Sequence, residues 1–379
     1  MEVKTDVAII GGGPAGSTLA ALLARKGIGV ALIDRDTFPR DKLCGEFLSY
    51  DALPILDRLG VNLDTAPQIS RCRVISRRAT YEFEFPRAAR GVSRMLLDAL
   101  LFRMGVERGA HDLSGWTAVN LSRDGVEAER GEERIRVTAR VVAGAWGRWG
   151  RFDTQLGRAF VRDRSHRNFG FKRHYRAAQS LATTIDLHSF DRGYLGVSPI
   201  ENGLTNICGL VHASRLAGHK GRWDAFVDEI RREEPVLDAM YARHEPDDPS
   251  FLSSEPVIFR ARSPVEGGVV MVGDASGVID PLTGNGMAMA IQSALVAAPH
   301  IVRMLDADRT SAETSYVRAH RQFFAPRIRW SRRVARLLSH PALLDAGLRV
   351  VKTPRAGAFL LRHTRGDDAT VERLAAEWF

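Results

Sequence analysis

Three glycines near the start of the chain have the spacing of a turn that holds the phosphates of a dinucleotide. Gly11, Gly13 and Gly16 stand in the segment GGGPAG, directly after the apolar run of residues 6–10. In such a turn the first glycine permits a sharp bend, the second lets the backbone approach a pyrophosphate, and the third allows close helix packing. Free N–H groups at the helix start attract the phosphates. The residues we expect at this contact are Gly11, Gly13, Pro14, Ala15 and Gly16.

The residues after the turn supply the elements and the acid that such a site needs. Residues 17–25 repeat apolar side chains at helical spacing, and the following Lys-Gly pair is a helix stop signal. Residues 29–33 predict a second strand, which ends at Asp34. A carboxylate at this place can accept hydrogen bonds from ribose hydroxyls, and we include Arg35 beside it in the cofactor contact. The pattern alone does not choose between FAD and NAD.

A second glycine-centred segment lies far along the chain. The buried-strand pattern of residues 268–272 is followed by GDASGVIDPLTGNGMAMAIQSALVAA at residues 273–298. With this segment the chain resembles the p-hydroxybenzoate hydroxylase-like flavoproteins, and among them the geranylgeranyl reductase family. The resemblance implies that Asp274 bonds the ribityl chain of FAD and that residues 281–287 run beside the flavin ring. The implied contacts are Gly273, Asp274, Pro281, Gly284, Asn285, Gly286 and Met287.

Three further segments extend this resemblance over roughly residues 1–300. FPRDKLCGE at residues 38–46 is similar to a reductase segment that passes beside the flavin. Arg94 and Asp98 match an R-x3-D helix whose arginine lies near the cofactor in that family. Residues 193–199 take the place of a Y-x-W-x-F-P strand that lines the substrate cavity. The cofactor contacts that these segments imply are Arg40, Cys44, Gly45 and Arg94.

Flavin chemistry needs a dry cavity and one or two groups that handle protons. In the reductase family the cysteine that matches Cys44 abuts the substrate, so Cys44 and Glu46 are the first candidates. His174 begins a strand expected to face the cavity and can exchange a proton near neutral pH. Tyr194, in the strand at residues 193–199 that lines the cavity, is a further candidate. A buried structural thiol and a structural histidine are the competing interpretations of Cys44 and His174.

The chain departs from the family pattern in ways that bear on the reaction. Trp146 stands where the hydroxylases carry the aspartate of an Asp-Gly pair, and an indole cannot accept the same hydrogen bonds. The replacement at Trp146 weakens the case for NADPH or NADH as a direct electron donor. Because the chain has only one dinucleotide fingerprint, such a donor would bind transiently. Gly196 and Ser198 replace bulky aromatic residues, so the cavity is either wider or filled by neighbours. The W-x-W-x-I-P segment of flavin halogenases is missing, which disfavours that class.

The predicted fold class is α/β. It combines a discontinuous Rossmann-like FAD-binding domain, an antiparallel-sheet substrate domain and a helical C-terminus. The FAD-binding domain comprises residues 1–75, 91–160 and 263–305, the substrate domain 76–90 and 161–262, and the helical region 306–379. Within the substrate domain we expect strands at residues 80–85, 181–187 and 203–211, and a helix at 223–234.

Composition limits the partners and the compartment. The net charge is +9. We interpret the excess arginines, at residues 71–78 and again at 327–333, as dispersed, so we expect no nucleic-acid partner. The three cysteines lack CxxC spacing, which indicates neither a disulfide framework nor a metal site and fits a cytoplasmic protein. No window reaches the roughly 18 apolar residues of a membrane span.

The basic amphipathic stretch at residues 327–340 has two interpretations. We expect it to dock on the body of the protein, and the alternative is peripheral membrane contact, where a hydrophobic substrate could be delivered. The sequence leaves the oligomeric state open.

The sequence therefore predicts an FAD-dependent oxidoreductase with a hydrophobic small-molecule substrate. The first hypothesis is a monooxygenase that hydroxylates an aromatic, polyketide-type or other hydrophobic metabolite. The alternative is a reductase that saturates C=C bonds of a prenyl or lipid chain. Oxidation of another intermediate, and a non-enzymatic binder that keeps FAD as a structural element, are the remaining interpretations.

Overall fold

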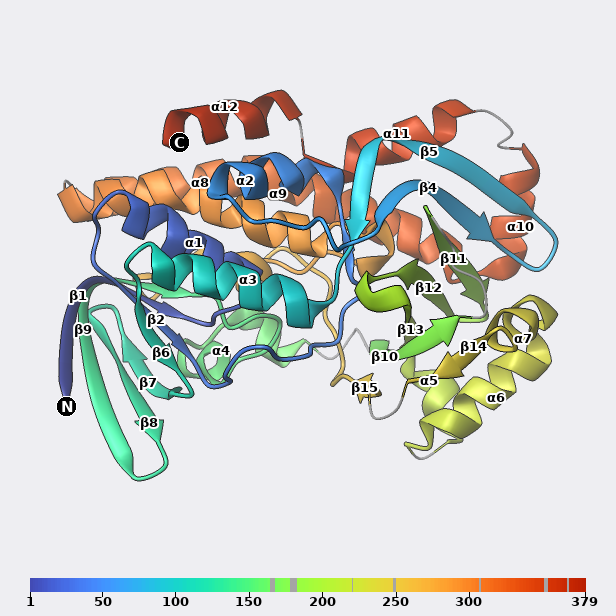
Figure 1. Cartoon of the computed structure of the whole chain (residues 1–379), viewed down its shortest axis with the longest axis horizontal. Coiled ribbons are helices and arrows are strands. Elements are labelled where there is room, and N and C mark those ends of the chain that lie inside the picture. Colours follow the sequence, from blue (N-terminus) through green and yellow to red (C-terminus); the bar gives the residue numbers. More distant parts are fainter. Residues whose placement is uncertain are drawn as a thin grey trace.

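The computed structural model describes residues 1–163, 168–177, 183–219, 221–247, 250–306, 308–350, 354–366 and 368–379. Two sheets lie side by side, and the long C-terminal helices cover them along one side (Figure 1). The predicted α/β class with a helical C-terminus is confirmed.

The first sheet is built around parallel strands that carry the glycine turn. Strand β1 (Glu2–Ile10) pairs in parallel with β2 (Val30–Asp34) on one side and with β9 (Glu133–Gly144) on the other. Strands of this kind are buried on both faces, which explains their continuous apolar runs. Helix α1 (Pro14–Arg25) connects β1 and β2 and packs on α3 (Arg94–Glu107). The other strands of this sheet are β6 (His111–Ser114), β7 (Thr117–Ser122), β8 (Gly125–Arg130), β16 (Val265–Glu266) and β17 (Val269–Met271).

The second sheet is mostly antiparallel. Its strand order is β14, β10, β13, β12, β11, β4, β5, β3, with β15 also paired to β10. Helices α6 (Trp223–Glu233) and α7 (Pro235–Tyr241) pack on one face of it. The strands are β3 (Phe47–Leu48), β4 (Gln68–Ile75), β5 (Thr80–Gly91), β10 (Asn168–Ala177), β11 (Thr184–Phe190), β12 (Gly193–Pro199), β13 (Leu204–His212), β14 (His244–Pro246) and β15 (Leu252–Ser253).

The first 75 residues contribute strands to both sheets. Strands β3 and β4 belong to the second sheet, and the domain bounds, with residues 1–75 in the FAD-binding domain, stay a prediction. Strand β4 forms a hairpin with β5 and also pairs in parallel with β11, more than 100 residues later in the chain. The strands expected at 80–85 and 203–211 and the helix at 223–234 are present as β5, β13 and α6. Of the strand expected at 181–187, residues 181 and 182 lie outside the described residues.

Helix α8 (Gly286–Asp306) is the central helix of the C-terminal layer. Its 21 residues are long and apolar enough to cross a membrane by length and composition, contrary to what the sequence predicted. Most of the helix is buried within the protein, between α1 and α9 (Arg309–Leu338), so its apolar character is that of a core helix. The remaining helices are α2 (Leu53–Leu59), α4 (Arg151–Gln155), α5 (Ala213–Leu216), α10 (Pro341–Val350), α11 (Pro354–Thr364) and α12 (Asp368–Trp378).

Candidate active site

The two glycine-centred segments meet in the folded chain. The first glycine turn is held in place by its own strands, because Gly11 N–H donates to the Ile33 carbonyl (2.7 Å) and Gly12 N–H donates to Asp34 Oδ2 (2.6 Å). The second segment touches the start of α1, since a methyl group added at Gly273 would lie 2.8 Å from the Cβ of Ala15. The predicted convergence of the two segments is therefore present.

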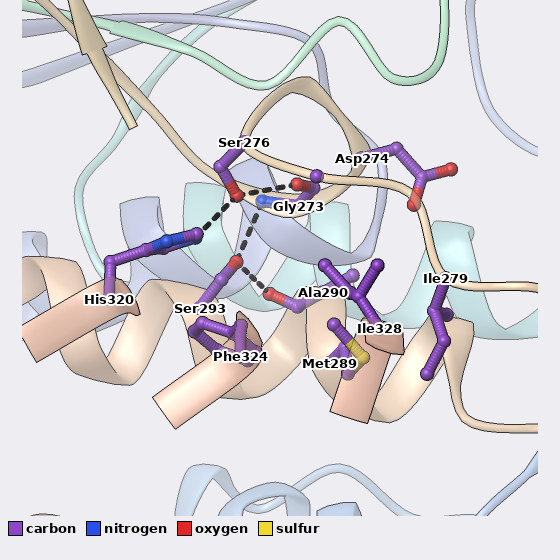
Figure 2. Close-up of a pocket in the computed structure, with 11 residues that line it drawn as sticks. Gly273, Asp274, Ser276, Ile279, Met289, Ala290, Ser293, His320, Phe324 and Ile328 are labelled. Carbon is purple, nitrogen blue, oxygen red and sulfur yellow. Dashed lines mark hydrogen bonds between the residues drawn. The ribbon is translucent and has the colours of Figure 1, made fainter. Parts of the chain in front are cut away.

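The short 3-10 turn η4 (Gly273–Ala275) presents Asp274 to the space between the two segments. Gly273 N–H donates to Ser293 Oγ (2.7 Å), and Ser276 Oγ donates to the Gly273 carbonyl (2.7 Å). Figure 2 shows the Asp274 side chain on the opposite side of this turn from His320. Burial raises the pKa of Asp274, although nearby guanidinium groups act to lower it. Those groups belong to Arg148, Arg262 and Arg94.

A chain of ion pairs borders the first glycine turn. Arg94 makes two hydrogen bonds to Asp98 (2.7 and 2.6 Å), and Asp98 is also paired with Arg40 Nη1 (3.3 Å). Arg40 Nη2 in turn lies 3.0 Å from Asp34 Oδ2. Burial alone would lower the pKa of Arg94, but the Asp98 carboxylate outweighs it and the pKa is raised. Arg94 is thus a permanently charged, rigidly held cation at the turn.

Glu46 lies at the centre of a buried cluster of ionisable groups. Its Oε1 accepts from Lys172 Nζ (2.7 Å) and from the backbone N–H of Arg94 (2.9 Å), and its Oε2 lies 2.6 Å from His174 Nε2. The side chains of Glu46 and Lys172 are fully buried. Glu46 itself has a positive φ of 54°, a conformation that turns its carboxylate into this cluster. Two of the predicted catalytic residues, Glu46 and His174, are therefore in direct contact.

Lys172 is a member of this cluster that the sequence did not single out. Its Nζ also bonds Asp41 Oδ1 (2.5 Å) and the Lys42 carbonyl (3.2 Å). Burial alone would lower the pKa of Lys172, but the Glu46 and Asp41 carboxylates outweigh it, so the pKa is raised. The available signal was the period of two along a strand, which places Lys172 on the same face as His174.

Cys44 lies next to the Glu46 cluster and is half-buried. Asn206 Nδ2 donates to its carbonyl (2.9 Å), and the Glu46 N–H points at its Sγ (3.4 Å). Burial raises the pKa of the Cys44 thiol above its usual value, although the Arg94 guanidinium acts to lower it. The thiol is therefore kept protonated at neutral pH.

Tyr194 connects the second sheet to the loop before α8. Its hydroxyl donates to Asp280 Oδ1 (2.7 Å), which also accepts from Leu282 N–H (3.1 Å) and so caps the 3-10 turn η5 (Pro281–Thr283). Burial raises the pKa of Asp280 to about 6, despite the Tyr194 hydrogen bond that acts to lower it. The Tyr194 hydroxyl is thus fixed by the carboxylate of Asp280.

This arrangement predicts a measurable pH dependence of stability. The pKa of Asp280 rises from 3.8 in the unfolded chain to about 6 in the fold, so its contribution to stability is complete below about pH 4. As the pH rises through 6 we expect the folded state to lose about 3 kcal/mol of this contribution. In Asp280→Asn, which keeps an acceptor for Tyr194, this loss should disappear. Chemical denaturation of both proteins between pH 4 and pH 7.5 measures the difference, and parallel curves for the two proteins would contradict it.

Comparison with known proteins identifies the family. The model of the family described as FAD binding domain matches residues 4–328. The chain belongs to the FAD-binding domain family. The chain is 29% identical over 370 residues to a menaquinone reductase from Mycolicibacterium smegmatis, and the match covers 91% of this chain and 87% of that protein. It is 26% identical over 363 residues to a tryptophan 2-halogenase from Chondromyces crocatus, covering 88% and 67%.

A solved structure shares the fold of this family member over its whole length. It is a geranylgeranyl bacteriochlorophyll reductase-like protein from Thermoplasma acidophilum, with a TM-score of 0.80 and 19% identity over 100% of this chain and 97% of that one. The protein is therefore an FAD-dependent oxidoreductase of the p-hydroxybenzoate hydroxylase-like type.

The first glycine turn fits the FAD that the family implies. A methyl group at Gly13 would have only Arg94 Nη2 near it, at 3.6 Å, so the space in front of the turn is bordered by a fixed cation. Among the described residues no side chain caps the first turn of α1, which leaves its N–H groups for a phosphate. Asp34 accepts three hydrogen bonds, from Gly12, Asp36 and Arg40, and a carboxylate can accept about one more, from a ribose hydroxyl.

Some residues expected to contact the cofactor have side chains that are exposed or that contact other parts of the protein. The Arg35 side chain is 69% exposed and is paired only loosely with Asp36 (3.7 Å). The Asn285 side chain is buried and donates to the Thr364 carbonyl, so it faces a C-terminal helix. Met287 packs in the main hydrophobic core. The other residues of the loop are Pro281 and Gly284, in and after η5, and Gly286, at the start of α8.

Trp146 is a packing residue. Its ring covers Gly144 and Gly150, where an added methyl group would lie 2.2 and 2.4 Å from ring atoms. Its Nε1 donates to Asp153 Oδ1 (3.3 Å), and Asp153 is in turn paired with Arg158 (2.8 Å). The indole is thus held in place by packing and by one hydrogen bond to a buried carboxylate.

Proposed function

We propose that this oxidoreductase saturates a C=C bond in a prenyl-bearing or similarly apolar substrate. The observation that supports the proposal is the position of Cys44, whose Sγ accepts from the Glu46 N–H (3.4 Å), beside the buried Glu46, Lys172 and His174 cluster. Saturation of a double bond requires a hydride at one carbon and a proton at the other, and a neutral thiol is a proton donor.

The residues of the cluster have separate roles in this reaction. Reduced FAD, when bound, supplies the hydride, and an external donor such as NADPH or NADH restores the electrons. Cys44 gives its proton to the second carbon, and the positive charges of Arg94 and Lys172 stabilise the thiolate that remains. His174 and Glu46, whose side chains are 2.6 Å apart, lie beside Cys44 and would supply the proton that restores its thiol.

The second sheet also has an apolar face. Residues that alternate along β4, β5 and β11 form one hydrophobic cluster with the C-terminal helices. It includes Val74, Phe83, Ile185 and the partly buried Leu187. The relative named menaquinone reductase acts on a quinone that carries a prenyl chain, which supports a substrate of this class.

Oxygen transfer is the second candidate reaction. Its support was the short side chain at Gly196, which would widen the cavity enough for a ring system. A methyl group at Gly196 would lie 3.5 Å from Leu187 Cδ2, an ordinary packing distance. Leu187 pairs with Gly196 across β11 and β12, so this contact does not choose between the two reactions, which the oxygen dependence of turnover distinguishes.

Anaerobic turnover tests the proposal. With a prenylated quinone, reductant and no oxygen, we expect a product two mass units heavier than the substrate. Cys44→Ala should lower product formation about 100-fold or more, because general acid catalysis typically contributes that much, while reduction of the bound flavin stays unchanged. Cys72→Ala, a buried cysteine of the second sheet, is the matched control and should keep its activity.

Two results would contradict the reductase. Turnover that needs oxygen and places a labelled oxygen atom in the product would establish a monooxygenase. A product that carries chlorine or bromine, formed with oxygen and halide, would establish the chemistry of the halogenase relative.

A further inference from the structure

The whole net charge of the protein lies in one segment. Residues 326–366 contain ten of the 54 Lys and Arg residues and one of the 45 Asp and Glu residues. This segment therefore has a formal charge of +9, equal to that of the chain, and the remainder is neutral. The excess arginine is concentrated, not dispersed as first expected.

The single acid of this segment does not neutralise its surface. Asp345 is buried, and it accepts hydrogen bonds from Ser76 Oγ and from Arg78 N–H. Two of the arginines, Arg327 and Arg365, are also buried. Among the arginines of this segment whose burial the structure describes, the exposed ones are Arg329, Arg333, Arg336 and Arg362.

Large apolar side chains are exposed among these arginines. Leu337 at the end of α9 is 41% exposed, Leu343 on α10 is 59% exposed, and Phe359 on α11 is 53% exposed. Phe359 packs edge-on against Trp330 (5.5 Å between ring centres), and Arg333 lies over the same indole (5.1 Å). Trp330, Arg333 and Leu337 are three and four residues apart on α9, so they share one face of the helix.

We propose that this surface, formed by Trp330, Arg333, Leu337, Leu343 and Phe359 with the surrounding arginines, docks on an anionic lipid bilayer. Basic side chains near a membrane surface are attracted by anionic headgroups, and exposed Leu, Phe and Trp side chains insert at the boundary of the acyl chains. Nucleic acid would satisfy the arginines, but it offers no apolar phase to cover Leu343 and Phe359. The combination therefore favours a membrane.

The interior side of the same helices explains what docking would accomplish. Leu338, Leu344 and Leu361 face inward and join the apolar cluster of the second sheet that includes Val74 and Phe83. Docking would thus bring the apolar cluster close to the membrane, which suits a substrate drawn from the bilayer. This last step depends on the proposed function, whereas docking itself does not.

Co-sedimentation of the full-length, FAD-loaded protein with vesicles tests the proposal. We expect binding to vesicles of phosphatidylcholine with 30% phosphatidylglycerol, and much weaker binding to phosphatidylcholine alone. Each arginine close to the membrane surface raises the partition coefficient about five-fold. The triple variant R329A/R333A/R336A should therefore lower the partition coefficient about 100-fold. Leu343→Ser with Phe359→Ser should lower it about ten-fold or more, because both apolar anchors are lost.

Arg318→Ala, an exposed arginine on the same helix but outside the segment, is the matched control and should bind like the wild type. Unchanged flavin content in each variant shows that the fold is intact. Binding that is indifferent to L343S/F359S, or binding to single-stranded oligonucleotides but not to vesicles, would overturn the proposal. Because the assay involves no turnover, its result is independent of whether the reductase activity is found.

Discussion

Replacing Lys172 with methionine is expected to lower the free energy of unfolding by about 3–5 kcal/mol, because it leaves the buried Glu46 carboxylate without its main countercharge. Lys172 is fully buried and bonds Glu46 (2.7 Å) and Asp41 (2.5 Å). A methionine fills a similar volume and forms neither ion pair. Guanidinium denaturation of the FAD-loaded protein at pH 7 measures the change.

Two further variants separate the buried ion pair from a general effect of losing a lysine. Lys42→Met removes a lysine that is 34% exposed and paired with Asp36 (2.8 Å), so we expect a loss below about 1 kcal/mol. The double variant K172M/E46Q removes both charges and should be more stable than K172M alone. A K172M protein as stable as K42M would show that the cluster contributes little.

The pH dependence of this effect has a definite sign. The pKa of Lys172 is raised above 10.5 in the fold, so its contribution to stability is complete below that value and is lost only as the pH rises through the higher folded value. The difference in stability between wild type and K172M should therefore be constant from about pH 6 to pH 9.

The sequence predicted the parts of the site that depend on local geometry. The turn at Gly11–Gly16, its helix and the strand to Asp34 follow each other within one short stretch, and the spacing of the glycines is imposed by the turn itself. Asp34 indeed lies beside the turn and bonds Gly12 N–H. The meeting of Ala15 with Gly273 was predictable only through the resemblance, because nothing local links segments so far apart.

The sequence did not predict contacts that depend on sheet register. Glu46 meets Lys172 and His174, which are 126 and 128 residues away, and the pairing follows from the position of β10 in the second sheet. The place of strand β4 in the second sheet was not predictable for the same reason, since its partner β11 comes more than 100 residues later. The concentration of charge in residues 326–366, by contrast, needed only a count by segment.

The close packing at the first glycine turn carries the last prediction. A methyl group at Gly16 would lie 1.8 Å from the Gly11 carbonyl oxygen and 3.0 Å from the Cβ of Ala145, so α1 must move away from β1 to accept it. This movement displaces the N–H groups that face the phosphates. We expect Gly16→Ala to weaken FAD binding about 100-fold or more and to lower the free energy of unfolding by about 1–3 kcal/mol. Titration of the protein with FAD, followed by flavin fluorescence, measures the affinity.

Gly347→Ala is the matched control, because a methyl group added at Gly347 in the middle of α10 would meet no described atom within 4 Å apart from its chain neighbours and the backbone of its own helix. Alanine favours the helix over glycine by about 1 kcal/mol, so this variant should bind FAD normally and be slightly more stable. If G16A bound FAD as tightly as G347A, the helix start would not be the phosphate site. FAD would then have to be held mainly by the loop that contains Asp274, and the fixed cation at Arg94 would need another explanation.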